Sequence, residues 1–205
     1  MKGYAFDKAS VLLVDDSAWM RVILRQMLKA LGFSHIQEAD NAESALASVR
    51  AAPPDIVLAD WDMRPMNGLE LTRRIRRLPD EARFAPIIMI SAFSTLGNVL
   101  AARNAGVSEF LVKPVAPQTL YHHLVAVIER PRMFVEAPGY SGPDRRRRDV
   151  EDGTAPRRRG GDQPVPSLPP GAAERQLSQA EISAIMNGAT NPMTAPMVEP
   201  MEARG

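Results

Sequence analysis

The chain has 205 residues, of which 45% are hydrophobic, with a net charge of +1 and no cysteine. The length favours one domain with a long appendage, the near-zero charge argues against nucleic-acid affinity of the whole protein, and the lack of cysteine excludes disulfides, thiolate metal sites and cysteine nucleophiles. There is no apolar signal core and no run of the ~18 apolar residues of a membrane span, so we expect a soluble cytoplasmic protein without membrane insertion.

Short apolar runs alternate with segments of helical periodicity over the first two thirds of the chain. The predicted strands are 11–14, 36–39, 56–59, 87–90 and 110–112. The predicted helices are 23–31, 40–51 with a capping box at Asp40-x-x-Glu43, 69–78, 96–105 and 120–128. Strands that alternate with helices form a parallel sheet covered on both faces. The predicted fold class is therefore α/β, a (βα)5 doubly wound parallel sheet, occupying residues 1–134.

Polar side chains stand just beyond the ends of four predicted strands. They are Asp15, Asp16, Asp60, Ser91 and Lys113. Ligands of such folds bind beyond the carboxyl ends of the strands, so we expect these five side chains to converge. Three carboxylates repel one another unless a cation lies between them, and an oxygen-only set with open positions suits Mg²⁺. The hydroxyl of Ser91 and the ammonium of Lys113 would neutralise a phosphoryl group on Asp60, which indicates phosphoryl transfer by positioning and charge neutralisation.

Residues 135–205 are expected to be a largely disordered tail. From residue 137 onward the chain holds ten of its 18 prolines, one aromatic residue and four Leu or Ile, too little apolar surface to offset the conformational entropy of folding. This part also cannot form the compact domain that a DNA-binding regulator would need, so we expect no DNA partner.

Within the tail, segment 139–160 has seven arginines and no lysine. The guanidinium group pairs with phosphate, binds the O6/N7 edge of guanine and stacks on bases, while interleaved carboxylates can accept from the opposite edge of guanine. A small, doubly charged ligand with two guanines therefore suits the segment better than a long polyanion. The candidate ligand-binding residues are Tyr140, Asp144, Arg145, Arg146, Arg147, Arg148, Asp149, Arg157, Arg158 and Arg159.

A short helix is predicted at 177–188. It has a capping box, a hydrophobic staple formed by Leu177 and Ile182, and Gly188 at its end. A helix this short is marginal by itself in water, so we expect it to form against another surface. Its candidate ligand or partner residues are Ser178, Gln179, Glu181 and Ile182.

Several motifs of the first 130 residues resemble response-regulator receiver domains, in particular CheY-like flagellar regulators. The matching pieces are Leu-Leu-Val-Asp-Asp (12–16), Met-Arg-Val-Ile-Leu-Arg (20–25), Asp-Trp-Asp-Met (60–63), Asn67-Gly68, Ile-Ser-Ala (90–92) and Leu-Val-Lys-Pro (111–114). The resemblance implies that Asp60 accepts a phosphoryl group from a histidine kinase.

The same resemblance implies roles for the other pocket residues. Asp15 and Asp16, with Asp60 and the backbone at residue 62, would hold Mg²⁺. Ser91, Lys113 and Phe110 would sense the phosphoryl group, and Phe110 stands where CheY has a switch tyrosine. The chain would therefore be no enzyme beyond phosphoryl acceptance and autodephosphorylation.

The tail helix, with its Leu-Ser-Gln-Ala-Glu-Ile run (177–182), resembles the N-terminal peptide of the flagellar switch protein FliM, which docks on phosphorylated CheY. It would either compete for the receiver's own face of fourth helix, fifth strand and fifth helix, or complete a ligand site. Together with Tyr-Ser-Gly-Pro-Asp-Arg-Arg-Arg-Arg (140–148), it resembles the Cle group of CheY-like proteins. That resemblance implies cyclic di-GMP as ligand, FliM or other motor components as partners, and recruitment to the flagellar motor or pole.

Two alternative hypotheses stay open. In the first, the chain is a kinase-phosphorylated single-domain receiver with an inert tail, so that Asp60→Ala abolishes its effect on the motor and replacement of the seven arginines changes nothing. In the second, the basic segment is an RNA-binding arm, which predicts affinity for long polyanions, a steep salt dependence and no preference for guanine.

Overall fold

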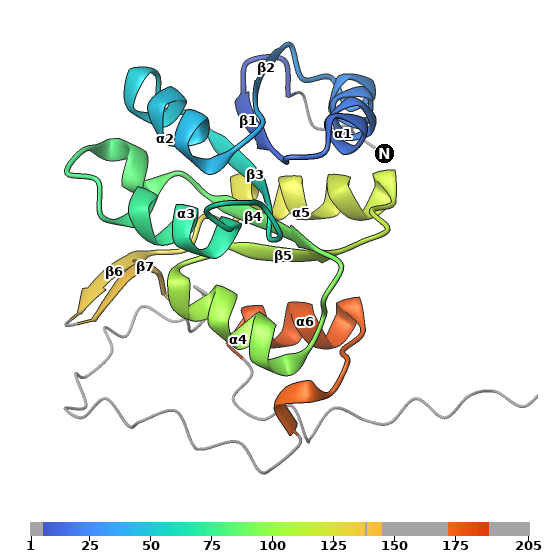
Figure 1. Cartoon of the computed structure of the whole chain (residues 1–205), viewed down its shortest axis with the longest axis vertical. Helices are drawn as coiled ribbons and strands as arrows, with labels where there is room; N and C mark the ends of the chain where they lie inside the picture. The colour runs from blue at the N-terminus through green and yellow to red at the C-terminus, as the bar shows by residue number, and fades with distance from the viewer. Residues whose placement is uncertain (1–5, 138, 145–171, 189–205) are drawn as a thin grey trace, which may run out of the picture.

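A computed structural model of the chain describes residues 6–137, 139–144 and 172–188. Five parallel strands form the central sheet, in the order β2-β1-β3-β4-β5 (Figure 1). These strands are β1 (Ser10–Val14), β2 (His35–Ala39), β3 (Ile56–Asp60), β4 (Ile87–Ser91) and β5 (Glu109–Val112). The helices that follow them are α1 (Ala18–Ala30), α2 (Ala42–Ala51), α3 (Gly68–Arg76), α4 (Leu96–Ala105) and α5 (Pro117–Glu129), with a 3-10 turn, η1, at Glu81–Phe84. The predicted doubly wound α/β fold is confirmed.

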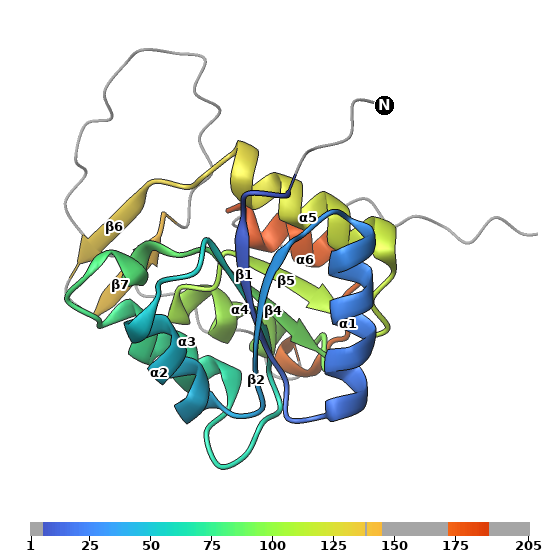
Figure 2. The same ribbon diagram turned by 90° about the horizontal axis from the view of Figure 1, so that it is seen from above.

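Helices cover both faces of the sheet because the central strands β3 and β4 are apolar at every position before their last residues, Asp60 and Ser91. All residues of β3 and all residues of β4 are buried. On one face, α1 and α5 pack with Leu13 and Leu58, and on the other, α2 and α3 pack with Leu12 and Val57 (Figure 2). With hydrophobic contacts above and below, such strands need no polar face, which explains their uninterrupted apolar runs.

Side chains at the ends of the loops that follow the strands cap the first turns of the helices. Ser17 caps α1, and Asn67 caps α3 by accepting a hydrogen bond from the amide of Glu70 at 2.9 Å. The predicted cap of α2 at Asp40 is wrong by one residue. Asn41 is the N-cap, because its Oδ1 accepts from the amide of Ser44 at 2.8 Å, whereas the Asp40 carboxylate accepts from the Asn41 side chain.

A β-hairpin beyond α5 was not predicted. It consists of β6 (Phe134–Ala137) and β7 (Tyr140–Pro143), which pair antiparallel, and it lies where the disordered tail was expected to begin. The hairpin packs on the domain through an edge-on contact between the rings of Phe134 and Phe84, with centroids 4.7 Å apart. This expectation is therefore corrected for residues 135–137 and 139–144, while residues 145–171 and 189–205 lie outside the described part of the chain.

The predicted tail helix is confirmed as α6 (Gln179–Met186), preceded by a 3-10 turn, η2, at Ala172–Glu174. Its capping box is complete: the hydroxyl of Ser178 accepts from the amide of Glu181, and the Glu181 carboxylate accepts from the amide of Ser178. α6 lies against β5 beside α4 (Figures 1 and 2). Over the described ranges, every helix is too short or too polar to cross a bilayer.

Candidate functional site

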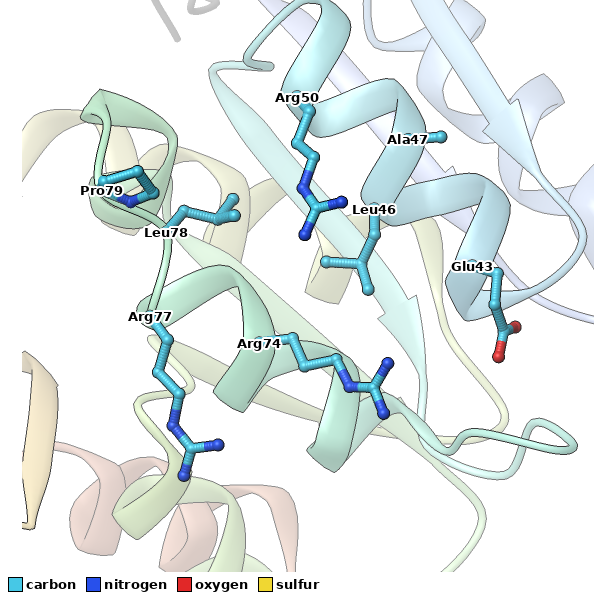
Figure 3. Close-up of a pocket in the computed structure, with 8 residues that line it drawn as sticks. All are labelled: Glu43, Leu46, Ala47, Arg50, Arg74, Arg77, Leu78 and Pro79. Atoms are coloured by element: carbon cyan, nitrogen blue, oxygen red, sulfur yellow. The ribbon is translucent and has the colours of Figure 1, made fainter.

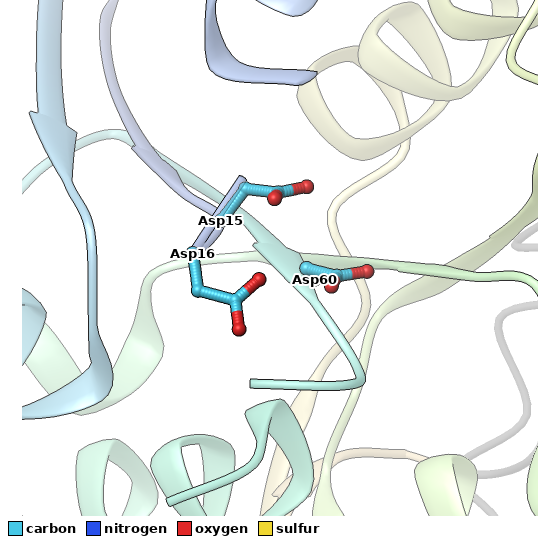
Figure 4. A group of neighbouring side chains, drawn as sticks. All are labelled: Asp15, Asp16 and Asp60. Atoms are coloured by element: carbon cyan, nitrogen blue, oxygen red, sulfur yellow. The ribbon is translucent and has the colours of Figure 1, made fainter. Parts of the chain in front are cut away.

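Three carboxylates meet at the carboxyl ends of β1 and β3. Asp15 and Asp16 follow β1, Asp60 ends β3, and the two strands are neighbours, with Val14 opposite Ala59. One oxygen atom from each carboxylate lies within 4.8 Å of the others (Figure 4). Asp15 and Asp60 are only 1% and 5% exposed, whereas Asp16 is open to solvent. Asp15 and Asp60 therefore form the buried part of the pocket, and Asp16 forms its solvent-exposed edge.

The buried carboxylate of Asp15 is electrostatically costly without a cation. Its Oδ1 accepts a hydrogen bond from the amide of Ser17 at 2.8 Å. Burial raises the pKa of Asp15 above its usual value and the charge of Asp60 raises it further, against the lowering effects of Ser17 and Lys113. A bound divalent cation would remove this penalty, because it stabilises the ionised form of every carboxylate around it.

Lys113 supplies the positive charge in the pocket. Its Nζ lies 2.8 Å from Oδ1 of Asp60 and 3.5 Å from Oδ2 of Asp15. Burial by itself would lower the pKa of Lys113, but the hydrogen bond and charge of Asp60, followed by those of Asp15, raise it overall. The side chain is therefore an ammonium group at neutral pH, held between the two buried carboxylates.

Ser91 lies on the neighbouring strand but is engaged elsewhere. It is buried at the end of β4, and its carbonyl accepts from the amide of Lys113 at 2.8 Å. Its hydroxyl accepts from the amide of Phe93 at 3.0 Å and donates to the carbonyl of Phe93 at 3.3 Å. Of the five residues expected to converge, the structure thus brings together the three carboxylates and Lys113, with Ser91 adjacent and its hydroxyl directed to the following loop.

The donor set fits Mg²⁺. Carboxylate oxygens are the hard ligands that this ion prefers, and three of them with an open side leave room for waters and for a phosphoryl oxygen. Asp15, Asp16 and Asp60 would hold the ion. The arrangement can support transfer of a phosphoryl group to a carboxylate oxygen of Asp60, since a bound ion and the ammonium of Lys113 would both offset the charge of the incoming group.

An aromatic contact connects the pocket to the hydrophobic cluster formed with α4 and α6. Trp61 directly follows Asp60, and its ring meets that of Phe110 edge-on, with centroids 6.2 Å apart. Phe110 is fully buried on β5 in a cluster that includes side chains of α4 and α6. The ring of Phe110, which was predicted to sense the phosphoryl group, therefore stands between the acidic pocket and the tail helix.

The tail helix covers the face formed by α4 and β5. Ile182 is 0% exposed, and Leu177, Ile185 and Met186 are also buried there. Because β5 is the edge strand of the sheet, its backbone has free polar groups, and the side chain of Gln179 pairs with them. Its Oε1 accepts from the amide of Val112 at 3.1 Å, and its Nε2 donates to the carbonyl of Phe110 at 2.8 Å.

The chain before α6 is held by the loop that follows β4. The amide of Leu177 donates to the carbonyl of Ser94 at 2.9 Å, and the hydroxyl of Ser94 donates to Oε1 of Gln176 at 2.8 Å. Of the residues singled out in the tail helix, Gln179 and Ile182 thus contact the receiver, whereas Ser178 and Glu181 cap the helix. Two roles were considered for the tail helix, to compete for a face of its own receiver or to complete a ligand site. This placement corresponds to the first of them.

The contacts at the far end of α6 were not predicted. Arg132 donates to the carbonyl of Met186 and to Oδ1 of Asn187, the latter at 3.0 Å, and its Nη2 lies 3.4 Å from Oε1 of Glu109. Glu109 also meets Nδ1 of His123 at 3.1 Å. No spacing in the sequence indicates these pairs, because the partners come from β5, α5, the loop after α5 and the end of α6. A charged residue such as Glu109 within an otherwise apolar strand was the one available signal.

Two of the candidate nucleotide-binding residues are described. Tyr140 belongs to the hairpin, and its hydroxyl donates to the carbonyl of Pro143 at 2.6 Å. The amide of Asp144 donates to the carbonyl of Met133 at 2.6 Å. The others lie outside the described residues: Arg145, Arg146, Arg147, Arg148, Asp149, Arg157, Arg158 and Arg159.

Comparisons with known proteins agree with this geometry. The model of the response regulator receiver domain family matches residues 11–125. Chemotaxis protein CheY-3 of Vibrio cholerae is 37% identical over 120 residues, which cover 58% of this chain and 92% of the relative. Chemotaxis protein CheY of Pseudomonas aeruginosa is 32% identical, covering 58% and 96%. The solved structure of Vibrio cholerae CheY4 matches with a TM-score of 0.54 and 30% identity, over 58% of this chain and 98% of that one. This chain therefore belongs to the response regulator receiver domain family.

Proposed function

We propose that this chain is a CheY-type regulator that accepts a phosphoryl group on Asp60 from a histidine kinase. The observation that carries the proposal is the pocket itself, in which Lys113 Nζ lies 2.8 Å from Asp60 Oδ1 and three carboxylates lie within 4.8 Å of one another. The relatives named as chemotaxis proteins support a role in chemotaxis through the flagellar motor, with a switch protein such as FliM as the partner of the phosphorylated form. A cytoplasmic protein recruited to the motor fits that role.

The pocket residues have separate tasks in this transfer. A carboxylate oxygen of Asp60 attacks phosphorus and displaces the donor group. Magnesium, when bound, neutralises charge on the phosphoryl oxygens. Lys113 exchanges its contact with Asp60 for one with a phosphoryl oxygen, and Ser91 rotates its hydroxyl from Phe93 to donate to another. Positioning and charge complementarity thus perform the reaction without a further catalytic group.

These movements of Lys113 and Ser91 would affect the tail helix, because residues next to both are hydrogen-bonded to the tail. Lys113 follows Val112, whose amide is bonded to Gln179, and Ser91 precedes the loop whose Ser94 holds Leu177. When the Ser91 hydroxyl leaves Phe93, that loop loses a bond that fixes its shape. We expect phosphorylation to release α6 and so to expose the α4–β5 face to the switch protein.

Labelling with a small phosphodonor tests the phosphoryl-accepting function. The full chain, incubated with acetyl phosphate and Mg²⁺, should gain the mass of one phosphoryl group on a peptide that contains Asp60. Asp60→Asn should gain none. Asp40→Asn is the matched control, because Asp40 is an exposed carboxylate beyond the neighbouring strand end, and it should label like the unmodified chain. Undiminished labelling of Asp60→Asn would overturn the assignment.

We also propose that segment 139–160 binds cyclic di-GMP and thereby controls the motor. Its seven arginines without lysine suit guanine and phosphate together. The observation that favours this second function is that described residues at the start of the segment and beyond its end contact the receiver. β7 packs beside α4 on one side, and η2 and α6 pack on α4 and β5 on the other. A ligand that binds the segment would therefore change how firmly α6 is held.

Calorimetric titration tests the second function. The full chain should bind cyclic di-GMP, and each single Arg→Ala change in the segment should cost on the order of 1–3 kcal/mol of binding free energy. Replacement of all seven arginines by alanine should abolish binding. Equal binding by the two proteins would contradict this function, and displacement of the ligand by random RNA at low salt would favour the RNA-binding alternative.

A further inference from the structure

A pocket lies at the amino ends of β4 and β5, at the opposite edge of the sheet from the acidic pocket. Pro86 and Ser108 directly precede these two strands, and the end of α5 and the hairpin β6–β7 form the other walls. The volume of the pocket is about 280 Å³, slightly below the roughly 300–1,000 Å³ of sites for drug-sized ligands. This size suits a smaller organic molecule, such as one with a single ring.

Most of the lining is apolar. The rings of Phe84 and Phe134 meet edge-on, which fixes the position of both, and the side chain of Val127 faces the same space. Phe84 nevertheless remains 47% exposed. A flat apolar body placed against this ring would remove its surface from water and add an aromatic contact, so the walls favour an aromatic ligand.

The polar groups of the lining that remain available are hydrogen-bond donors. Arg130 is the C-cap residue of α5, and its exposed guanidinium has neither an ion pair nor a hydrogen bond with any described residue. Ser108 is 6% exposed, and its hydroxyl accepts from the amide of Ile87 at 3.1 Å. Among the described residues, no atom accepts the hydrogen of that hydroxyl. Two donors of this kind match an anionic oxygen on the ligand.

The one carboxylate of the lining, Glu109, is already engaged. Its oxygens lie 3.4 Å from Nη2 of Arg132 and 3.1 Å from Nδ1 of His123. The Glu109–Arg132 pair leaves Arg130 as the uncompensated charge of the pocket. The electrostatic potential therefore favours an anion over a cation or a neutral molecule.

We propose that this pocket binds a small aromatic carboxylate. Its ring packs against Phe84 and Phe134, its carboxylate accepts from the guanidinium of Arg130, and Ser108 supplies a second donor. The site is separate from the acidic pocket, and binding there requires neither phosphorylation of Asp60 nor a nucleotide.

One wall of the pocket also anchors the tail helix. Arg132 lines the pocket and donates to the carbonyl of Met186 and to Oδ1 of Asn187 at the end of α6. A ligand in the pocket holds residues 131–134 in the conformation in which Arg132 reaches α6. The ligand therefore stabilises the docked helix, and by reciprocity release of the helix weakens binding of the ligand.

The test is a nuclear magnetic resonance titration of the full chain with phenylacetate and with its neutral counterpart, phenylacetamide. Phenylacetate should shift the amide signals of Ser108, Val127 and Phe134. Phenylacetamide should bind at least about tenfold more weakly, because it lacks the charge that Arg130 recognises. Arg130→Gln should weaken phenylacetate binding by about three- to tenfold. Ala126→Leu enlarges a side chain of the lining and should remove binding.

Arg50 provides the matched control for Arg130, since both are exposed arginines at the C-terminal end of a helix. Arg50 lines a different groove, between α2 and α3, where its side chain points toward Leu46 (Figure 3). Arg50→Gln removes the same charge from the domain without altering the proposed site. The affinity for phenylacetate should therefore stay within about twofold of that of the unmodified chain.

The link to α6 has its own measurements. In the chain saturated with phenylacetate, hydrogen exchange at the amide of Asn187 should slow, and Ile182→Ala, which disturbs α6 away from the pocket, should weaken phenylacetate binding. Unchanged exchange at Asn187 would contradict the link. Equal binding of phenylacetate and phenylacetamide, or equal affinities of Arg130→Gln and Arg50→Gln for phenylacetate, would overturn the carboxylate site itself.

Discussion

The acidic pocket and the α6 contact face are built in different ways, although they lie on adjacent parts of the same sheet. The pocket takes its side chains from strand ends, so the parallel topology alone brings Asp15 and Asp60 together. The α6 face depends on complementary shapes and on backbone groups of an edge strand, paired with Gln179 from far along the chain. The pocket is therefore part of the receiver fold itself, whereas the tail contact is an added and separable layer.

Removing the central apolar contact of α6 should have the largest effect on stability. It should disrupt the α6 contact face and leave the acidic pocket intact. Ile182→Ala deletes a fully buried side chain, which costs about 2–5 kcal/mol in a well-packed core. Since α6 is short and marginal by itself, we expect it to detach. Hydrogen exchange at the amides of Val112 and Leu177 should become fast, while exchange in β1 and β3 stays slow.

Ser183→Ala is the control for that change, because Ser183 is not part of the buried cluster of α6. It should leave the exchange of the same amides unaltered. Loss of the receiver's overall stability in Ile182→Ala, in place of local release of the tail, would contradict the separation of the two regions.

Substitution of Gly68, which lies beside the backbone of Asp60, should instead disturb the acidic pocket. A Cβ at Gly68 would lie 2.1 Å from the carbonyl oxygen of Asp60 and 2.9 Å from Sδ of Met89. Gly68→Ala must push α3 away from β3, so we expect a loss of about 1–3 kcal/mol in the free energy of unfolding, measured in urea, together with slower labelling of Asp60. Gly97→Ala, whose Cβ would lie 3.3 Å from its nearest neighbour, should change the free energy by less than about 1 kcal/mol.

Asp15→Asn should change the free energy of unfolding by a smaller amount, and it should raise it. Burial raises the folded-state pKa of Asp15, so the fold favours the neutral form and loses stability as pH rises through that pKa. The amide is neutral at every pH. In the presence of a chelator at pH 7, the variant should therefore have a higher urea midpoint than the unmodified chain.

The pH dependence supplies the control for this variant. The difference should shrink as pH falls toward the pKa of a free aspartate, about 3.9, because both proteins then have a neutral side chain at this position. A lower midpoint for Asp15→Asn at pH 7 would show that the bonds to Ser17 and Lys113 outweigh the cost of burial.

The smallest effect is expected at the cap of α6. Ser178→Ala removes the hydroxyl that accepts from the amide of Glu181, which costs about 1 kcal/mol. Hydrogen bonds from the backbone and hydroxyl of Ser178 lower the pKa of Glu181, so their stabilising effect is full above the usual pKa of glutamate and disappears as pH falls through the lowered value. Helical exchange protection in α6 should decrease accordingly in acid, and less steeply in Ser178→Ala.

The elements that sequence reasoning predicted are those with local causes. Apolar runs and helical spacing were sufficient for all five strands and helices of the receiver, and the capping box was sufficient for α6. The hairpin was missed because Tyr-Ser-Gly-Pro has weak strand character. Its position depends on a close backbone approach, since a Cβ at Gly142 would lie 2.8 Å from the Cα of Gly106. Such a contact exists only once the domain has folded.

The candidate site shows the same division. Asp15, Asp16, Asp60 and Lys113 were predictable because each stands at the end of a strand or just beyond it. The bonds of the Ser91 hydroxyl to Phe93 and those of Gln179 to the backbone of β5 were not predictable, since they depend on which rotamer and which free backbone group the packing leaves available.

Hydrogen exchange of the full chain with and without phosphorylation tests the central claim most directly, namely that the pocket controls the tail helix. In the presence of acetyl phosphate and Mg²⁺, exchange at the amides of Val112 and Leu177 should accelerate by about tenfold or more, and it should not accelerate in Asp60→Asn. Unchanged exchange in a fully phosphorylated chain would contradict the account, because it would mean that the acidic pocket and α6 act independently.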